Sequence, residues 1–166
     1  MIRPYTAFCF LALTTLTTYS AEVEKFRLRN IKKWQGGPVR NLCITPKIPN
    51  QASVMLMGAE CGDHDNQYFT VDEEGRLMNT STKTCIYTKT NDANVELLRL
   101  GPCWTADPNR QFLYMTMDGA LAVFYPDGPK YIAPQENPKI DGMKILRLRP
   151  RNYKRLAQRW EVDKSK

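Results

Sequence analysis

Short runs of alternating apolar and polar residues recur along most of the chain, and Gly, Asp, Asn and Pro separate the runs. Residues 95–100 and 144–149 are two such runs, residues 54–57 form a shorter apolar run in the corresponding place, and each fits a strand with one buried face. Beyond residue 21, no stretch carries an apolar stripe at helical spacing over three turns. The pattern therefore predicts a nearly all-β chain in which turns join short strands.

A glutamine followed two residues later by a large apolar side chain occurs three times, and successive glutamines are 44 and 47 positions apart. The pairs are Gln67 with Phe69, Gln111 with Leu113, and Gln158 with Trp160. Aligning the glutamines also aligns three Cys-Ile-type segments and two turn-and-strand segments, namely 41–46, 83–88 and 129–134, with 72–78 and 117–123. This joint register predicts three repeats of about four strands each, over residues 26–70, 71–114 and 115–162.

A single repeat of this size cannot bury its own apolar face. Three repeats around a pseudo-threefold axis can close into a barrel capped by hairpins, which also removes exposed strand edges. We expect the apolar members of the glutamine motif to pack in that core. We interpret the glutamines as structural, because their amides can bind backbone groups where strands turn and would otherwise be buried unpaired.

The first 21 residues have the pattern of a secretory signal peptide. Arg3 precedes an apolar run over residues 7–13, and small and hydroxyl residues follow up to Ala21. The alternative, a membrane anchor, is disfavoured because the run is shorter than the roughly 20 residues that a spanning helix needs. We therefore expect a secreted, extracellular domain over residues 22–166.

Four cysteines remain beyond the signal segment. Cys43 and Cys61 are 18 positions apart, and so are Cys85 and Cys103. An even number of cysteines in a secreted chain indicates disulfides. Four cysteines allow three connectivities, and the two equal spans favour pairing within two copies of one unit. A zinc site is the alternative, but the chain has one histidine and lacks the close-spaced cysteine pairs typical of such sites.

The second repeat resembles the ricin B-type lectin domain, a β-trefoil with QxW motifs. The residues that carry the resemblance are Gly75, Leu77, Asn79, 84–86, Cys103, Gln111 and Leu113. The resemblance implies an all-β trefoil with disulfides Cys43–Cys61 and Cys85–Cys103. The third repeat departs from the pattern, since Tyr131 stands at the first cysteine position and we expect Arg149 at the second.

The same resemblance implies where sugars would bind, and most of those residues are replaced. The family's aspartate positions hold Thr45, Tyr87 and Ala133, and its stacking positions fall near Ala59, Gly101 and Arg147, none of them aromatic. An asparagine beside the glutamine is kept as Asn66, and Asn109 lies one position off in the second repeat. An aromatic ring and a few polar groups suffice to bind a sugar. We therefore take Tyr87, Trp104, Asn66 and Asn109 as candidate carbohydrate-binding residues.

The chain carries a formal net charge of +7, and its basic residues gather near the two ends of the folded domain. The first and last strands of a trefoil are neighbours, so we expect one basic patch formed by Arg27, Arg29, Arg147, Arg149 and Arg151. Such a patch would meet anionic glycans, lipid head groups or an acidic protein. Nucleic acid is not expected for a secreted chain. The alternative is that these are solvated strand faces without a partner.

No catalytic constellation is evident. His64 is the single histidine and lies in a polar loop, and no free cysteine or motif-placed serine accompanies it. We therefore predict a binding protein that needs no cofactor or metal, a secreted lectin-like protein for glycans or glycoproteins of cell surfaces.

Two alternatives remain open. Residues 26–30, 42–44 and 146–150 are similar to accessory subunits of cytolethal distending toxins, which implies a cell-binding or accessory role with a partner subunit. The other alternative is a trefoil that binds no sugar and acts through protein contacts or its basic face.

Overall fold

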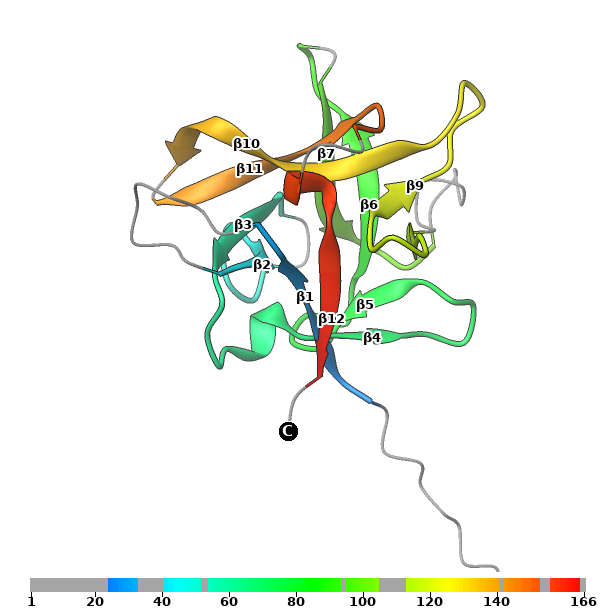
Figure 1. Ribbon diagram of the computed structural model, residues 1–166. Helices are drawn as coiled ribbons and strands as arrows, with labels where there is room; N and C mark the ends of the chain where they lie inside the picture. The colour runs from blue at the N-terminus through cyan, green and yellow to red at the C-terminus, as the bar shows by residue number, and fades with distance from the viewer. Residues whose placement is uncertain are drawn as a thin grey trace, which may run out of the picture.

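The computed structural model describes residues 24–32, 41–51, 54–93, 95–104, 113–140, 142–152 and 156–164. Within these ranges the chain forms a twelve-stranded antiparallel sheet, so the all-β prediction is confirmed (Figure 1). The strands are β1 (Phe26–Asn30), β2 (Leu42–Pro46), β3 (Leu56–Glu60), β4 (Phe69–Val71), β5 (Leu77–Asn79), β6 (Cys85–Thr90), β7 (Glu96–Gly101), β8 (Leu113–Met115), β9 (Leu121–Val123), β10 (Lys130–Ile140), β11 (Met143–Arg149) and β12 (Trp160–Lys164). Two single-turn 3-10 helices are η1 (Asp65–Gln67) and η3 (Leu156–Gln158). None of the helices in the described ranges has the length and apolar character needed to cross a membrane.

Three hairpins, β2–β3, β6–β7 and β10–β11, meet one another at one end of the molecule. Strand β3 pairs with β11, and β11 pairs with β7 where Arg147 lies opposite Leu97. A bridge between Met55 and Arg99 joins the first hairpin to the second. Similar contacts thus recur three times about one axis, which is the pseudo-threefold β-trefoil predicted from the repeats.

The two ends of the domain close the sheet. Strand β1 pairs with β12 along its whole length, from Phe26 opposite Lys164 to Asn30 opposite Trp160. In Figure 1 the first strand, in blue, runs beside the last strand, in red. The Trp160 backbone N–H also donates to the carbonyl of Gly119 at 2.6 Å, which ties β12 to the β8–β9 turn.

The core contains the apolar residue of each glutamine motif. Phe69, Leu113 and Trp160 are all buried, and the Trp160 indole Nε1 donates to the Ile132 carbonyl at 3.0 Å. Alternate residues of the strands complete the core, among them Leu28, Ile44, Leu56, Ile86, Leu98, Leu100, Val123, Leu146 and Leu148. Period-two alternation therefore places one face of each hairpin on the core and leaves the other face outside.

Glutamine amides fasten the ends of two repeats. The Gln67 Oε1 accepts a hydrogen bond from Gly62 N at 2.9 Å, and its Nε2 donates to the Glu60 carbonyl at 2.8 Å and to Thr45 Oγ1 at 2.9 Å. Gln158 repeats the geometry, since its Oε1 accepts from Asn152 N and its Nε2 donates to the Pro150 carbonyl. Gln111 lies outside the described residues. Each of these two amides thus bonds the backbone of the residues just before and just after one position, residue 61 or residue 151. This agrees with the interpretation of the glutamines as structural.

Two buried asparagines reinforce these glutamine turns. The Asn79 Nδ2 donates to the carbonyls of Asn66 and Tyr68, the two neighbours of Gln67. The Asn30 Nδ2 makes the same pair of bonds to Ala157 and Arg159, the two neighbours of Gln158. Asn79 also begins an Asn-Thr-Ser glycosylation sequon, yet its side chain is fully buried and both amide hydrogens are used. The folded protein therefore has no room for a glycan at this nitrogen.

Two disulfides link Cys43 to Cys61 and Cys85 to Cys103, the pairing that the resemblance implies. In the third repeat, the guanidinium of Arg151 lies over the ring of Tyr131 at 4.8 Å. The Gln158 bonds to residues 150 and 152 show that Arg151 occupies the second cysteine position. We expected Arg149 at the second cysteine position, two residues before Arg151. That expectation is wrong, because Arg149 instead lies directly opposite Tyr131 on the β10–β11 hairpin.

Candidate functional site

A polar pocket of about 570 Å³ opens beside η1 in the first repeat. Its lining is made of carboxylate, amide, hydroxyl and imidazole groups, with one proline, and the residues are Pro49, Asn50, Asp63, His64, Asp65, Asn66 and Ser81. Such a set offers hydrogen-bond acceptors and donors that converge from three separate loops. The pocket contains Asn66, which the sequence singled out, whereas Asp63 and Asp65 were not expected from the family pattern.

The floor of this pocket is held by the glutamine turn. The Asn66 carbonyl accepts from Asn79 Nδ2 at 2.8 Å, and the Asp65 carbonyl accepts from Thr80 Oγ1 at 3.0 Å. These bonds fix the backbone of η1 without using the side chains of Asp65 or Asn66. The Asn66 Oδ1 is buried and has no hydrogen-bond partner among the described residues. A buried amide oxygen without a partner is uncommon in native proteins.

The walls of the pocket are tied to their surroundings. The Ser81 hydroxyl donates to Asn50 Oδ1 at 2.5 Å, and Asn50 adopts a left-handed backbone with φ of 59°. The Tyr68 hydroxyl donates to Asp63 Oδ1 at 3.1 Å. Burial, followed by this bond to Asp63, raises the pKa of Tyr68 above its ordinary value, so the phenol stays protonated and keeps donating. Asp65 is exposed and makes no described side-chain bond, which leaves its carboxylate available.

The candidate residues of the second repeat lie elsewhere. Tyr87 projects from β6 across β7, and a Cβ built on Gly101 would come within 2.6 Å of the Tyr87 ring. The ring therefore packs on the glycine that replaces the family's stacking residue. Trp104 directly follows Cys103 and is 81% exposed. Asn109 lies outside the described residues. The structure thus does not bring Asn66, Tyr87 and Trp104 into one described pocket.

The expected basic patch across the chain closure is wrong. Strand β1 pairs along its whole length with β12, where Glu161 and Asp163 lie opposite Arg29 and Arg27. Arg27 pairs with Asp163 at 2.7 Å and Arg29 pairs with Glu161 at 2.5 Å, so the two arginines of β1 have carboxylate partners. Arg27 also donates to the Gly62 carbonyl and lies 5.1 Å from the centre of the Tyr68 ring. These two side chains hold the first strand in place.

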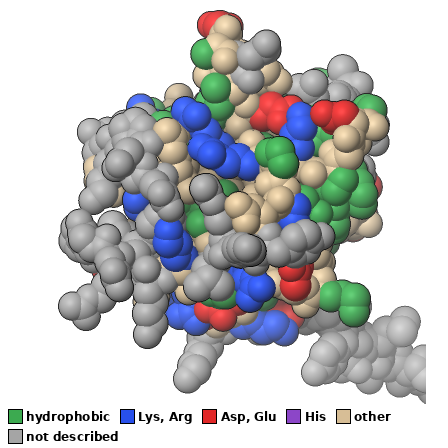
Figure 2. Space-filling model, turned by 45° about the horizontal axis from the view of Figure 1, so that its top comes forward, with side chains coloured by type: hydrophobic (Ala, Val, Ile, Leu, Met, Phe, Trp, Pro, Cys, Tyr) green, Lys and Arg blue, Asp and Glu red, His purple; other side chains and the backbone are tan. Residues whose placement is uncertain are grey.

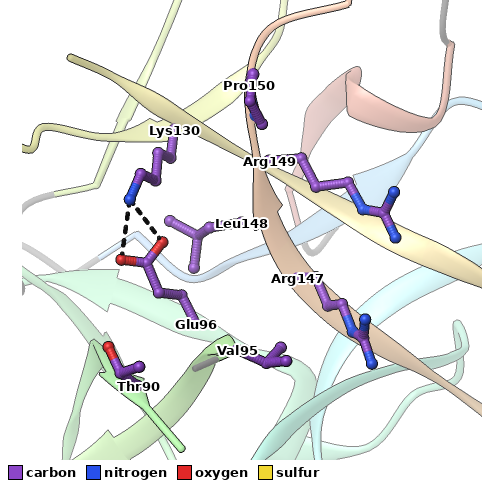
Figure 3. A pocket seen from close by; sticks show the side chains of 8 residues that line it. All are labelled: Thr90, Val95, Glu96, Lys130, Arg147, Leu148, Arg149 and Pro150. Carbon is purple, nitrogen blue, oxygen red and sulfur yellow. Dashed lines mark hydrogen bonds and ion pairs between the residues drawn. The ribbon is translucent and has the colours of Figure 1, made fainter. Parts of the chain in front are cut away.

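The three remaining arginines of the predicted patch divide into two kinds. Arg151 has a structural role, because it forms an ion pair with Asp118 and its guanidinium lies over the Tyr131 ring. Arg147 and Arg149 lie on β11, and Figure 3 shows both extending to one side of that strand, away from the Lys130–Glu96 pair. Arg147 and Arg149 therefore lie on β11, at the hairpin end of the molecule, and not beside the arginines of β1.

A shallow pocket of about 540 Å³ lies between β11 and the tip of the β6–β7 hairpin (Figure 3). At its base Lys130 Nζ pairs with Glu96 at 3.1 Å and with Asp127 at 3.6 Å. Burial acts to lower the pKa of Lys130, but the hydrogen bond and charge of Glu96 outweigh it, and the pKa lies above its ordinary value. The lysine charge is thus neutralised by acidic neighbours, unlike the charges of Arg147 and Arg149.

One group of possible metal ligands occurs within the described ranges. Asp72 lies with the sulfurs of Cys85 and Cys103, with all ligand atoms within 4.8 Å of one another. The two sulfurs are joined in a disulfide, so they offer no thiolate. The Asp72 carboxylate instead accepts from the backbone N–H groups of Glu74 and Arg76 in the β4–β5 turn. We assign this group to the structure of the turn.

Three hairpins about a pseudo-threefold axis, with buried glutamine amides at the ends of repeats, define the β-trefoil found in R-type (ricin B-type) lectins. The structural similarity to such lectins extends over most of the chain and establishes the fold.

Particular solved structures share this fold. The β-trefoil lectin of the Vibrio vulnificus hemolysin/cytolysin, solved with N-acetyl-D-lactosamine bound, has a TM-score of 0.62 at 20% identity, over 87% of this chain and 96% of that one. The C-half of an earthworm R-type lectin, solved with GalNAc, has a TM-score of 0.60 at 9% identity, over 86% and 99%. A mosquitocidal holotoxin has a TM-score of 0.65 at 14% identity over 87% of this chain, which spans 18% of the holotoxin's length. No protein-family model and no curated protein matches the sequence.

Proposed function

We propose that this protein is a secreted, non-catalytic, lectin-like binding protein that recognises carbohydrate on cell surfaces through the polar pocket beside η1. The observation that carries the proposal is the polar pocket itself, in a trefoil of the lectin type, where the exposed carboxylate of Asp65 has no side-chain partner among the described residues. The two disulfides are typical of an extracellular protein and support the location.

Sugar recognition needs directional acceptors for hydroxyl groups. A carboxylate accepts two hydroxyl hydrogen bonds at once, and an amide supplies one acceptor and two donors. Asp65 and Asn66 provide that combination on adjacent positions of one turn, and Asn50 and Ser81 face them from two other loops. No tryptophan, tyrosine or phenylalanine lines the pocket, so Pro49 and the His64 ring are the groups available to contact the apolar face of a sugar.

Asp65→Asn tests this site, because it removes the charge and keeps the size of the side chain. We expect the variant to bind N-acetylgalactosamine or N-acetyllactosamine about tenfold more weakly, or worse, than the wild type, measured by calorimetric titration. These two sugars are the ligands in the lectin structures that share the fold. Asp92→Asn is the matched control, since Asp92 is exposed in the β6–β7 turn outside the pocket.

Two results would contradict the proposal. The first is wild-type protein that binds neither sugar nor any neutral glycan of a broader panel. The second is Asp65→Asn that binds as tightly as Asp92→Asn. Asn66→Ala supplies an independent check, because it removes an amide from the pocket lining, and its folding is verified from an unchanged unfolding temperature.

A cell-binding part of a toxin is a second candidate function. The observation that favours it is the toxin origin of two proteins that share the fold, a hemolysin/cytolysin and a holotoxin. In this role the same pocket would attach the complex to a cell, and a partner subunit would bind elsewhere. Co-purification of a second polypeptide from the source, in a fixed ratio, is the result that this role predicts.

A further inference from the structure

Three arginines lie on one outer face of the hairpin sheet. Arg147 of β11 is directly opposite Leu97 of β7, and Arg99 and Arg149 are each two positions away along those strands. Side chains two positions apart on a strand point to the same side. The intervening Leu98, Leu146 and Leu148 are buried in the core, so the arginines face away from it. Figure 2 turns the β10–β11 end forward and shows Lys and Arg side chains gathered over this face.

No described carboxylate neutralises these three arginines. None of Arg99, Arg147 and Arg149 has an ion pair or a side-chain hydrogen bond within the part of the chain that the structure describes. The Nε atoms of Arg99 and Arg147 are buried and unpaired, so both lose water without gaining an acceptor. Guanidinium groups without a carboxylate partner attract oxyanions, so an oxyanion bound across the face would be stabilised there.

Two more side chains extend the same face on β6. Tyr87 lies directly opposite Arg99, and Lys89 lies directly opposite Leu97 and is exposed. The neighbouring acid, Glu96, points to the other side and is engaged by Lys130. From strand geometry, the Cα atoms of Arg99 and Arg149 are about 14 Å apart, with Arg147 between them. The face is therefore an elongated row of cations, longer than a single monosaccharide, with the Tyr87 ring and the half-buried Leu97 and Met55 on the same side.

We propose that this row, defined as Lys89, Arg99, Arg147 and Arg149, is a second binding surface of the protein, specific for an extended sulfated glycan. It goes beyond the neutral-sugar pocket beside η1 and does not depend on that pocket. Guanidinium groups bind oxyanions through paired N–H donors, and a linear chain with repeated sulfates can contact several of them at once.

A sulfated glycan fits this face better than an anionic membrane does. Proteins that lie on membranes combine basic residues with exposed apolar side chains that enter the lipid. The large apolar side chains that are exposed in the described ranges include Trp104, Met117 and Phe124, and none of them lies on β6, β7 or β11. The two disulfides are typical of extracellular proteins, which is the compartment where a sulfated glycan would be met.

The experiment measures binding of the full protein to immobilised heparin and to heparin stripped of its sulfates, by surface plasmon resonance at about 0.15 M and about 0.5 M NaCl. We expect wild-type binding to heparin alone, and a strong loss at the higher salt. R147Q/R149Q should bind about tenfold more weakly or worse, since each charge-assisted hydrogen bond contributes substantially. K83Q/K164Q removes two exposed lysines on other elements, and it should bind within about twofold of wild type.

Several outcomes would overturn this proposal. One is equal weakening in R147Q/R149Q and K83Q/K164Q, which would mean diffuse attraction by net charge. Another is equal binding to desulfated heparin, and a third is binding to phosphatidylserine vesicles with no binding to heparin. The single variant R149Q changes only an exposed side chain and keeps the test valid if R147Q/R149Q unfolds. R147Q/R149Q should lose heparin binding and keep neutral-sugar binding, and Asp65→Asn should do the reverse. This pattern separates the two proposed surfaces.

Discussion

Gln67 and Gln158 show how one side chain organises a repeat. Each amide bonds the backbone on both sides of a half-cystine position, Cys61 in one case and Arg151 in the other. The spacing of the glutamines and their apolar partners was enough to predict this role. The asparagines that complete the turn, Asn30 and Asn79, were not predicted, because each acts on the turn of another repeat and the link appears only once the strands are paired.

At the scale of the single residue, Gln158→Ala should lower the free energy of unfolding by about 2–4 kcal/mol, because two backbone groups lose their partners in the repeat that has no disulfide. Urea unfolding followed by tryptophan fluorescence measures the change. Gln51→Ala is the control, since Gln51 is exposed, and it should change stability by less than about 0.5 kcal/mol. Equal effects of the two substitutions would contradict the assignment.

At the scale of the element, the β10–β11 hairpin carries a cation–π pair where the other two hairpins lead into a disulfide. Arg151 covers Tyr131 and also reaches Asp118 in the β8–β9 turn, so one side chain joins two hairpins. Sequence alignment identified Tyr131 but placed its partner two residues early. Strand registers on a hairpin depend on the turn and its bulges, and the irregularity between Pro134 and Lys139 is of this kind.

The register of the β10–β11 hairpin predicts that two substitutions would create a third disulfide. Y131C/R151C should form an intramolecular bond under oxidising conditions, which would add about 3 kcal/mol through the closed loop and lose about 1 kcal/mol of cation–π attraction. Thiol titration of the unfolded protein measures whether the bond has formed. The unfolding temperature with and without reductant measures its effect on stability. The matched variant Y131C/R149C follows the sequence-based alignment, and it should keep two free thiols. Bond formation in that variant and not in Y131C/R151C would contradict the register.

At the scale of the whole molecule, local patterns predicted the fold well and the surfaces poorly. Strand alternation, the glutamine spacing and the cysteine spacing are repeated signals, so the all-β trefoil and its threefold order followed from them. The basic patch failed because it depends on which strands are neighbours. Residues 146–149 were expected beside β1, but β12 takes that place and brings Glu161 and Asp163 to Arg27 and Arg29.

The polar pocket was missed for a related reason. Its walls come from three loops that are distant in sequence, and only Asn66 belonged to a motif. The residues at Thr45, Tyr87 and Ala133 predicted that the family's usual sugar positions are altered, and in the structure the Tyr87 ring packs on Gly101. A binding site built from loops leaves little trace in a single sequence, because its residues share neither period nor spacing.

A glycan array probed with the wild-type protein at about 0.15 M and about 0.5 M NaCl tests the central claim most directly. The claim is that this trefoil is a carbohydrate-binding protein. The account predicts binding to neutral galactose-type glycans that persists at the higher salt, because hydrogen bonds in a pocket are little screened, together with binding to sulfated glycans that is lost there. Protein that is folded and disulfide-bonded, yet binds no glycan of either class at either salt, would contradict the claim.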